Sequence, residues 1–410
     1  MPASGEVSRC ETAIARAQAR YEQAALRALG KCEARVASGT LSPTTDCHAD
    51  PVTIVAIGRA RDKAASGISK GCCGADRVCG TGDDDTSASL GWGATCPNFA
   101  NGACSNTIAD PGDVAVCLGC VGAGAIDQVV DVVYGRMRHG TAGAVLDRCR
   151  AAIGKAVGKF VVAKTKALST CWSARARGRH TNPCPDPGDG KAAAAIASAT
   201  ATLHASICGA CGGVDGACGG GDDLAPADVG FVAECPAVDV PGGGSCAATV
   251  ATLDDVAACI GCITEFAVDC ADRAAVPAFA AYPGECNPPP GTCSAGVQCE
   301  TNFDCPAGYT CRDNGAGITH YCVGPSCADD AACTGGAVCR QFCTPSGCEP
   351  RHCQCPGFGC GGTDQLCLDD GGLQCRLICL QDSDCVDPFG FVCVNPGFGF
   401  GVCIGSLPCQ

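Results

Sequence analysis

The stretch 113-DVAVCLGCVGAGAIDQ-128 recurs further along the chain as 255-DVAACIGCITEFAVDC-270. In the first occurrence a C-x-x-C pair, Cys117 and Cys120, lies just after an aspartate that is typical of a helix start. Two cysteines one helical turn apart lie on one face of a helix. The pair could therefore be a redox dithiol, half of a metal site, a haem anchor or two structural half-cystines, and the rest of the sequence has to decide between them.

The recurring motif ends a longer repeat, because residues 10–120 and 149–262 each contain ten cysteines in the same order and at nearly the same spacing. We call these ranges the first and the second copy. We expect structural disulfides at Cys10, Cys32, Cys47, Cys72, Cys73, Cys79, Cys96, Cys104, Cys117, Cys120, Cys149, Cys171, Cys184, Cys208, Cys211, Cys218, Cys235, Cys246, Cys259 and Cys262. Cys270 has no counterpart in the first copy, and we expect it to bridge forward to Cys286.

Each copy predicts a small bundle of about three helices. Apolar and cysteine positions at 4-3-4-3 spacing predict an amphipathic helix from Cys10 to Cys32, and again from Cys149 to Cys171. A second helix is expected at about 51–70 and 191–207, and the C-x-x-C motif begins the third. The chain is poor in aromatic residues (5%), so cross-links have to stabilise these bundles.

From about Cys286 the helical periodicity ends, and 21 cysteines fall in 125 residues. The pattern C-x5-C-x5-C at 299–311 and 327–339, and a looser form at 379–393, predict cross-linked hairpins with almost no core. The predicted fold is mainly α, with two tandem disulfide-stapled small helical bundles followed by a disulfide-rich irregular or small-β region. The expected segments are 6–140, 141–282 and 283–410.

The cysteine content, 42 in 410 residues, indicates an oxidising compartment, so we expect a secreted or cell-surface protein. The first residues, MPASGEVSRC, lack the features of a signal peptide, and the export route stays open. No membrane span is expected, because the longest uncharged run, 192–214, is only weakly apolar.

Several chemistries of the C-x-x-C motif can be compared. A c-type haem needs a following histidine, but Val121 and Ile263 follow the two motifs. A thioredoxin-like dithiol needs a βαβ context that this pattern lacks. Zinc could be held together with "GCCGADRVC" (71–79) or "CGACGGVDGAC" (208–218), with "RHCQC" (351–355) as a further candidate. The cysteine spacing differs between the two copies, which favours disulfides.

Acidic turns recur in "CGTGDDD" (79–85) and "CGGGDD" (218–223). Their carboxylates offer the hard oxygen ligands that Ca²⁺ prefers, although solvated turns of this composition are common. The candidate calcium ligands are Asp83, Asp84, Asp222 and Asp223. No other cofactor is expected.

Charge is distributed unevenly in this chain of net charge −14. Residues 148–180 contain nine basic and no acidic residues. We expect a basic patch on the solvent side of this helix at Arg148, Lys155, Lys159 and Lys166. It could bind an anionic polymer or pair with acidic loops. Nucleic acid is not expected, because no aromatic residues interleave the charges.

The stretch "CETNFDCPAGYTC" (299–311) resembles cysteine-rich repeats of extracellular proteins from myxobacteria and other deltaproteobacteria, and distantly resembles Dickkopf-type and EGF-like modules. The helical repeat, with Cys96-Pro97, Cys235-Pro236 and the late C-x-x-C, is similar to uncharacterised cysteine-rich proteins of the same lineages. The resemblance implies a secreted or surface location and transfers no catalytic residue.

No catalytic motif such as H-E-x-x-H or G-x-S-x-G occurs in the sequence. We therefore expect a non-enzymatic, extracellular or cell-surface structural or adhesive protein that assembles with itself or binds an extracellular anionic polysaccharide. The alternatives are a regulatory binding module, such as a protease inhibitor or metal-binding protein, and, third, a small extracellular hydrolase.

Overall fold

The computed structural model describes residues 5–287, apart from 43, 101–103, 136–142 and 232, together with ten short strands between residues 310 and 404. It contains two compact units, Met1–Pro288 and Pro289–Gln410. The first is mainly helical and disulfide-stapled, as the sequence predicts.

The helices of the first unit follow the two copies in order. Their bounds are α1 Gly5–Ala37, α2 Pro51–Cys72, α3 Pro111–Tyr134, α4 Ala144–Ala176, α5 Ala192–Cys211, α6 Pro226–Val229 and α7 Leu253–Ala274, followed by a 3-10 turn, η1 Gly284–Cys286. Thus α1, α2 and α3 come from the first copy, and α4, α5 and α7 are their counterparts in the second.

The repeated motif begins its helix in the same way in both copies. At α3, the Asp110 carboxylate accepts hydrogen bonds from the first-turn backbone, and the Asp113 carboxylate accepts one from the backbone N–H of Asp110. At α7, Thr252 and Asp255 form the same capping box. The aspartate that starts each copy of the motif therefore satisfies backbone donors that a helix leaves free at its N-terminus.

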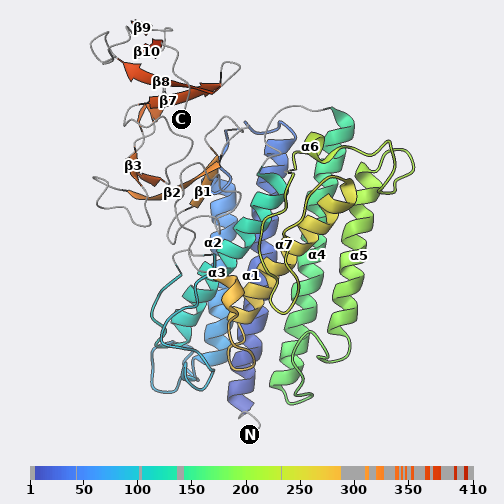
Figure 1. Ribbon diagram of the computed structural model, residues 1–410. Helices are drawn as coiled ribbons and strands as arrows, with labels where there is room; N and C mark the ends of the chain where they lie inside the picture. Colours follow the sequence, from blue (N-terminus) through green and yellow to red (C-terminus); the bar gives the residue numbers. More distant parts are fainter. Residues whose placement is uncertain are drawn as a thin grey trace. The chain divides into compact units, whose positions relative to one another are not determined.

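The helices of both copies share one core (Figure 1). One layer contains α2, α1, α4 and α5 side by side, and α3 and α7 pack together against it. Each long helix therefore contacts its counterpart, α1 with α4 and α3 with α7. The sequence predicts two tandem bundles, and the structure joins them through these helix pairs into a single compact unit.

Eleven disulfides link described residues, and ten of them form five equivalent pairs. The bridges are Cys10–Cys72 and Cys149–Cys211, Cys32–Cys47 and Cys171–Cys184, Cys73–Cys79 and Cys208–Cys218, Cys96–Cys117 and Cys235–Cys259, and Cys104–Cys120 and Cys246–Cys262. The eleventh, Cys270–Cys286, is the bridge that the unmatched Cys270 predicts.

One equivalence differs from simple sequence order. Cys72, the first of its adjacent pair, bridges to α1, and in the second copy it is the later cysteine, Cys211, that bridges to α4. Cys208, one helical turn before Cys211, therefore takes the role of Cys73 and reaches Cys218. The change of spacing is accommodated because positions on either side of a helix end can reach the same loop.

In the second unit, the described residues form short antiparallel strands. They are β1 Thr310–Asp313, β2 His320–Ser326, β3 Val338–Arg340, β4 Cys343–Thr344, β5 Gly347–Cys348, β6 His352–Gln354, β7 Gln365–Asp369, β8 Leu373–Cys379, β9 Val392–Val394 and β10 Gly401–Ile404. They form two four-stranded sheets, β1-β2-β6-β3 and β7-β8-β10-β9, and the pair β4-β5. The predicted C-x5-C-x5-C hairpins lie largely outside the described residues.

Candidate functional site

The C-x-x-C motif forms no bridge within itself. Cys117 bridges Cys96, and Cys120 bridges Cys104, both in the loop before the helix. The second copy repeats this arrangement at its own motif. The motif thus ties a Gly-rich loop to the third helix of each copy, and its sulfurs are not thiolates for redox exchange or for a shared zinc site. The side chains of the further zinc candidate, 351–355, lie outside the described residues.

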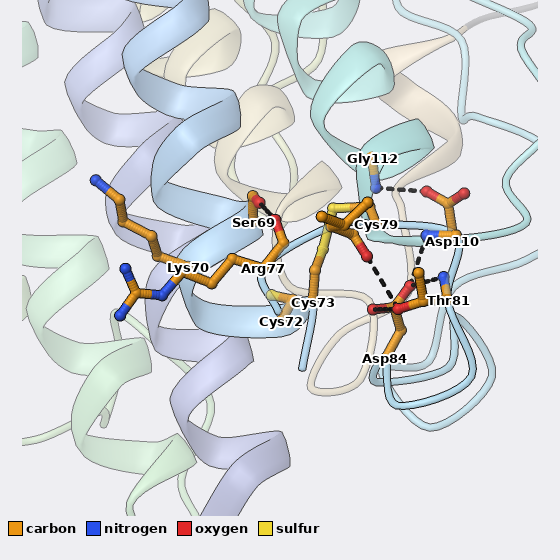
Figure 2. Close-up of a disulfide and its surroundings, with 12 residues drawn as sticks. Ser69, Lys70, Cys72, Cys73, Arg77, Cys79, Thr81, Asp84, Asp110 and Gly112 are labelled. Carbon is orange, nitrogen blue, oxygen red and sulfur yellow. Dashed lines mark hydrogen bonds between the residues drawn. A yellow bond between two sulfur atoms is a disulfide. The ribbon is translucent and has the colours of Figure 1, made fainter. Parts of the chain in front are cut away.

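The four predicted calcium ligands hold the turns in which they lie. Asp83 accepts the backbone N–H of Ala75 at 2.8 Å, and its counterpart Asp222 accepts that of Val214 at 2.7 Å. Asp84 accepts the N–H of Gly80 at 2.6 Å, and its counterpart Asp223 accepts that of Gly219 at 2.7 Å. Figure 2 shows Asp84 beside Thr81 and the Cys73–Cys79 bridge. These hydrogen bonds give the recurring aspartates a structural role in the turns, and calcium binding stays a prediction.

The four basic residues predicted on the solvent side of α4 are all exposed. They are Arg148, Lys155, Lys159 and Lys166, and the cysteines that mark the buried seam, Cys149 and Cys171, are inaccessible. Their spacing of seven, four and seven residues places all four side chains on one face of the helix, where they form a single stripe. Because the helix rises about 1.5 Å per residue, the stripe is about 27 Å long.

The same stripe occurs on α1, where sequence reasoning missed it. Arg9, Arg16, Arg20 and Arg27 occupy the counterpart positions and are exposed. Superposing the two copies on Cys10 and Cys149 would have found them. We call these eight residues the basic face.

The two stripes lie on the same side of the helical layer. On α1, a side chain at Gly122 of α3 would meet Gln18 and Tyr21, so these two residues mark the side that faces α3. With 100° of rotation per residue, Arg16, Arg20 and Arg27 are centred about half a turn from them. In addition, α1 and α4 contact each other, with Gln23 donating to Thr165 at 2.8 Å. Because α4 uses the counterpart positions, its stripe also points away from α3 and α7.

Acidic residues do not neutralise this face within the described part of the chain. No ion pair there involves any of its eight members. The carboxyl groups of α1 at Glu11, Glu22 and Glu33 are buried on the opposite side of the helix. The exposed charge of the α1–α4 pair is therefore positive on a protein that is strongly acidic overall.

A buried ionic cluster joins α4 to α7, two helices of the second copy, behind this face. Lys164 of α4 is 1% exposed, and its Nζ lies 2.7 Å from Glu265 and 2.9 Å from Asp269, both on α7. Near it, the indole of Trp172 donates to Asp272 at 2.6 Å. Lys164 belongs to the basic segment 148–180 but has no role in the predicted patch. Its position four residues after the buried Phe160 was the sequence signal that it points inward.

Burial dominates the ionisation of this cluster. It raises the pKa of Asp272 to about 7, against the lowering effect of the Trp172 hydrogen bond. Burial likewise raises the pKa of Asp269 by more than the adjacent Lys164 lowers it, and raises that of Glu22 on α1. These carboxyl groups lie inside the helical unit, and we assign the cluster to the packing of α4 against α7 rather than to chemistry on a substrate.

Comparison with protein-family models, curated proteins and solved structures yields no match. By length and composition, α3 and α5 are apolar enough to cross a membrane. However, α3 is a core helix with Val114, Cys117 and Val121 inaccessible, and α5 is bridged to α4, so this is weak evidence for a span. The disulfides indicate that the protein folds in an oxidising environment.

Proposed function

We propose that this protein is a non-enzymatic extracellular or cell-surface scaffold that adheres to an anionic polysaccharide through the basic face. The observation that carries the proposal is the repetition of the stripe. Two copies present cations at the same positions on adjacent helices, and none of these cations is paired with a described carboxylate.

The shape of the basic face supports an extended ligand over a small ion. Its charges are distributed along about 27 Å of helix, at separations of about 6 and 10 Å, so a single small anion reaches only one or two of them. A linear polyanion can contact many at once and gains from each weak contact. The lack of interleaved aromatic side chains still disfavours single-stranded nucleic acid.

The disulfides support a scaffold role. Helices cross-linked near both ends hold the charged residues at fixed spacing, so the protein loses little conformational entropy when it binds. The same bridges restrict local unfolding, which is where proteases cleave.

The proposal is tested by binding of the full chain to immobilised polygalacturonate and dextran sulfate, with neutral dextran as the reference. We expect binding to both polyanions and none to the neutral polymer. Neutralising the α4 stripe with Arg148→Gln, Lys155→Gln, Lys159→Gln and Lys166→Gln should weaken binding at least tenfold.

A matched control removes four exposed cations elsewhere, with Lys63→Gln, Arg77→Gln, Arg179→Gln and Lys191→Gln. It changes the net charge by the same amount and should keep most of the affinity. Equal loss in both variants would mean that net charge alone governs binding. No binding of the unmodified chain would contradict the proposal outright.

A further inference from the structure

A histidine and a carboxylate lie against one disulfide of the second copy. Nε2 of His204 is 2.8 Å from Oδ1 of Asp254 and 4.0 Å from Sγ of Cys208, which is bonded to Cys218. One potential ligand atom from each of the four residues falls within 4.8 Å of the others. Three separate elements supply them, because His204 and Cys208 lie on α5, Asp254 on α7 and Cys218 in the loop between.

The first copy provides the contrast. Its equivalent bridge, Cys73–Cys79, has Ala65 and Gly112 at the positions that correspond to His204 and Asp254. Figure 2 shows Gly112 near Cys79, and a side chain at this glycine would come within 3.9 Å of the Cys79 sulfur. Both bridges staple the same turn, so stapling does not require the histidine and the aspartate.

We propose that reduction of the Cys208–Cys218 disulfide creates a Zn²⁺ site formed by the two thiolates, Nε2 of His204 and a carboxylate oxygen of Asp254. A dithiol is the reductant: it transfers two electrons and two protons, breaks the S–S bond and leaves as its own disulfide. Zn²⁺ then replaces the two thiol protons, which are released to solvent.

The ligand set suits zinc. Thiolate sulfur, imidazole nitrogen and carboxylate oxygen are all ligands that zinc binds in tetrahedral sites, with bonds of about 2.0 to 2.3 Å that place ligand atoms about 3.3 to 3.8 Å apart. The nitrogen lies at 4.0 Å from one sulfur and 2.8 Å from the oxygen, so small side-chain movements reach this geometry. Once the sulfurs are no longer bonded, they are free to separate to the same spacing.

Both reagents reach the site through three of its four residues, because Cys208 itself is buried at 5% exposure. The side chains of His204 and Asp254 are 48% and 49% exposed, and Cys218 is partly exposed. Another histidine near a bridge, His180, lies beside Cys171–Cys184, whose cysteines are 0% and 1% exposed, and the described residues there supply three ligands. In the oxidised state a disulfide links α5 to the loop that contains Cys218, and in the reduced state the bound metal links them instead.

The test uses the full chain and just enough dithiothreitol for peptide mapping to show Cys208 and Cys218 reduced. The chain is then desalted, incubated with or without Zn²⁺, and alkylated. We expect zinc to protect these two cysteines from alkylation at least tenfold, and Co²⁺ in its place to produce a thiolate-to-metal charge-transfer band. Any reduced Cys73 and Cys79 in the same sample should stay unprotected.

The variants His204→Ala and Asp254→Asn should lose at least about tenfold in zinc affinity while the oxidised form keeps its helical circular dichroism. Zinc protection that is equal in the wild type and both variants would overturn the proposal. So would equal alkylation of Cys208 and Cys218 with and without zinc. The outcome is independent of the basic face, which lies on other helices.

Discussion

Lys164 of α4 and Asp269 of α7 form a buried ion pair, with Nζ and Oδ1 2.9 Å apart. In the first copy, the counterpart of Lys164 is the buried Ala25, so the pair belongs to the second copy alone. Replacing Lys164 by Met should destabilise the protein by about 3 kcal/mol at neutral pH, because it leaves a buried carboxyl group without its cation.

Urea unfolding of this variant measures the loss. Lys166→Met, two residues along on the exposed side of the same helix, is the control and should change the free energy of unfolding by no more than about 0.5 kcal/mol. Equal effects in the two variants would mean that the buried pair adds nothing specific.

Asp272 should make stability depend on pH. Its pKa is about 7 in the folded protein and close to 3.8 when unfolded. The folded state therefore holds a proton that the unfolded state has lost between these values, so stability falls as pH rises from about 4 through about 7. Asp272→Asn still accepts the Trp172 hydrogen bond, and we expect a flatter profile and a more stable protein at pH 8. Melting temperatures from pH 4 to 8 measure this, with Asp62→Asn, at an exposed position, as the control.

The disulfides should contribute unequally. Cys10 and Cys72 are separated by 62 positions, and Cys73 and Cys79 by six. On the chain-entropy account, removing the first bridge by paired alanine substitutions costs about 4 kcal/mol and removing the second about 2 kcal/mol. Unfolding of the two variants in urea gives the order, and a larger loss for the short loop would show that local packing outweighs chain entropy.

The acidic turn should be sensitive at Gly74. This glycine has a φ of +50°, and a Cβ there would meet the carboxylate of Asp83. We expect Gly74→Ala to cost about 1 to 2 kcal/mol, from left-handed backbone strain and displacement of that carboxylate. At Gly82, in the same turn, a Cβ meets nothing within 4 Å, and Gly82→Ala should be close to neutral. Thermal unfolding compares the two, and similar melting temperatures would contradict the role of Asp83 in the turn.

Local features of the fold were predictable because the repeat specifies them. The cap residues and the C-x-x-C spacing place the start of α3 and α7, and the 4-3-4-3 seam places α1 and α4. The repeated copies also favour disulfides over metal at the C-x-x-C motif. The pairing of each copy with the other was not predictable, because it depends on which faces of α1, α4, α3 and α7 meet.

Of the basic face, the sequence predicted the stripe on α4 but not the stripe on α1. The stripe on α4 is visible as an uninterrupted basic segment, but on α1 the arginines alternate with glutamates, and charge counting along the chain hides them. Only the folded structure shows that the negative and positive charges of α1 lie on different sides of the helix, because Glu11, Glu22 and Glu33 are buried. The bridging partners of Cys73 and Cys208 likewise depend on where each lies near the end of its helix, and not on the order of the cysteines in the sequence.

The most direct test of the account is the salt dependence of binding to dextran sulfate. If the basic face carries the interaction, the logarithm of the affinity should fall linearly with the logarithm of the salt concentration as counterions are released. Neutralising the four α4 residues should make that slope roughly half as steep, because four of the eight cations remain. An unchanged slope in that variant, or an affinity independent of salt in the wild type, would contradict the account.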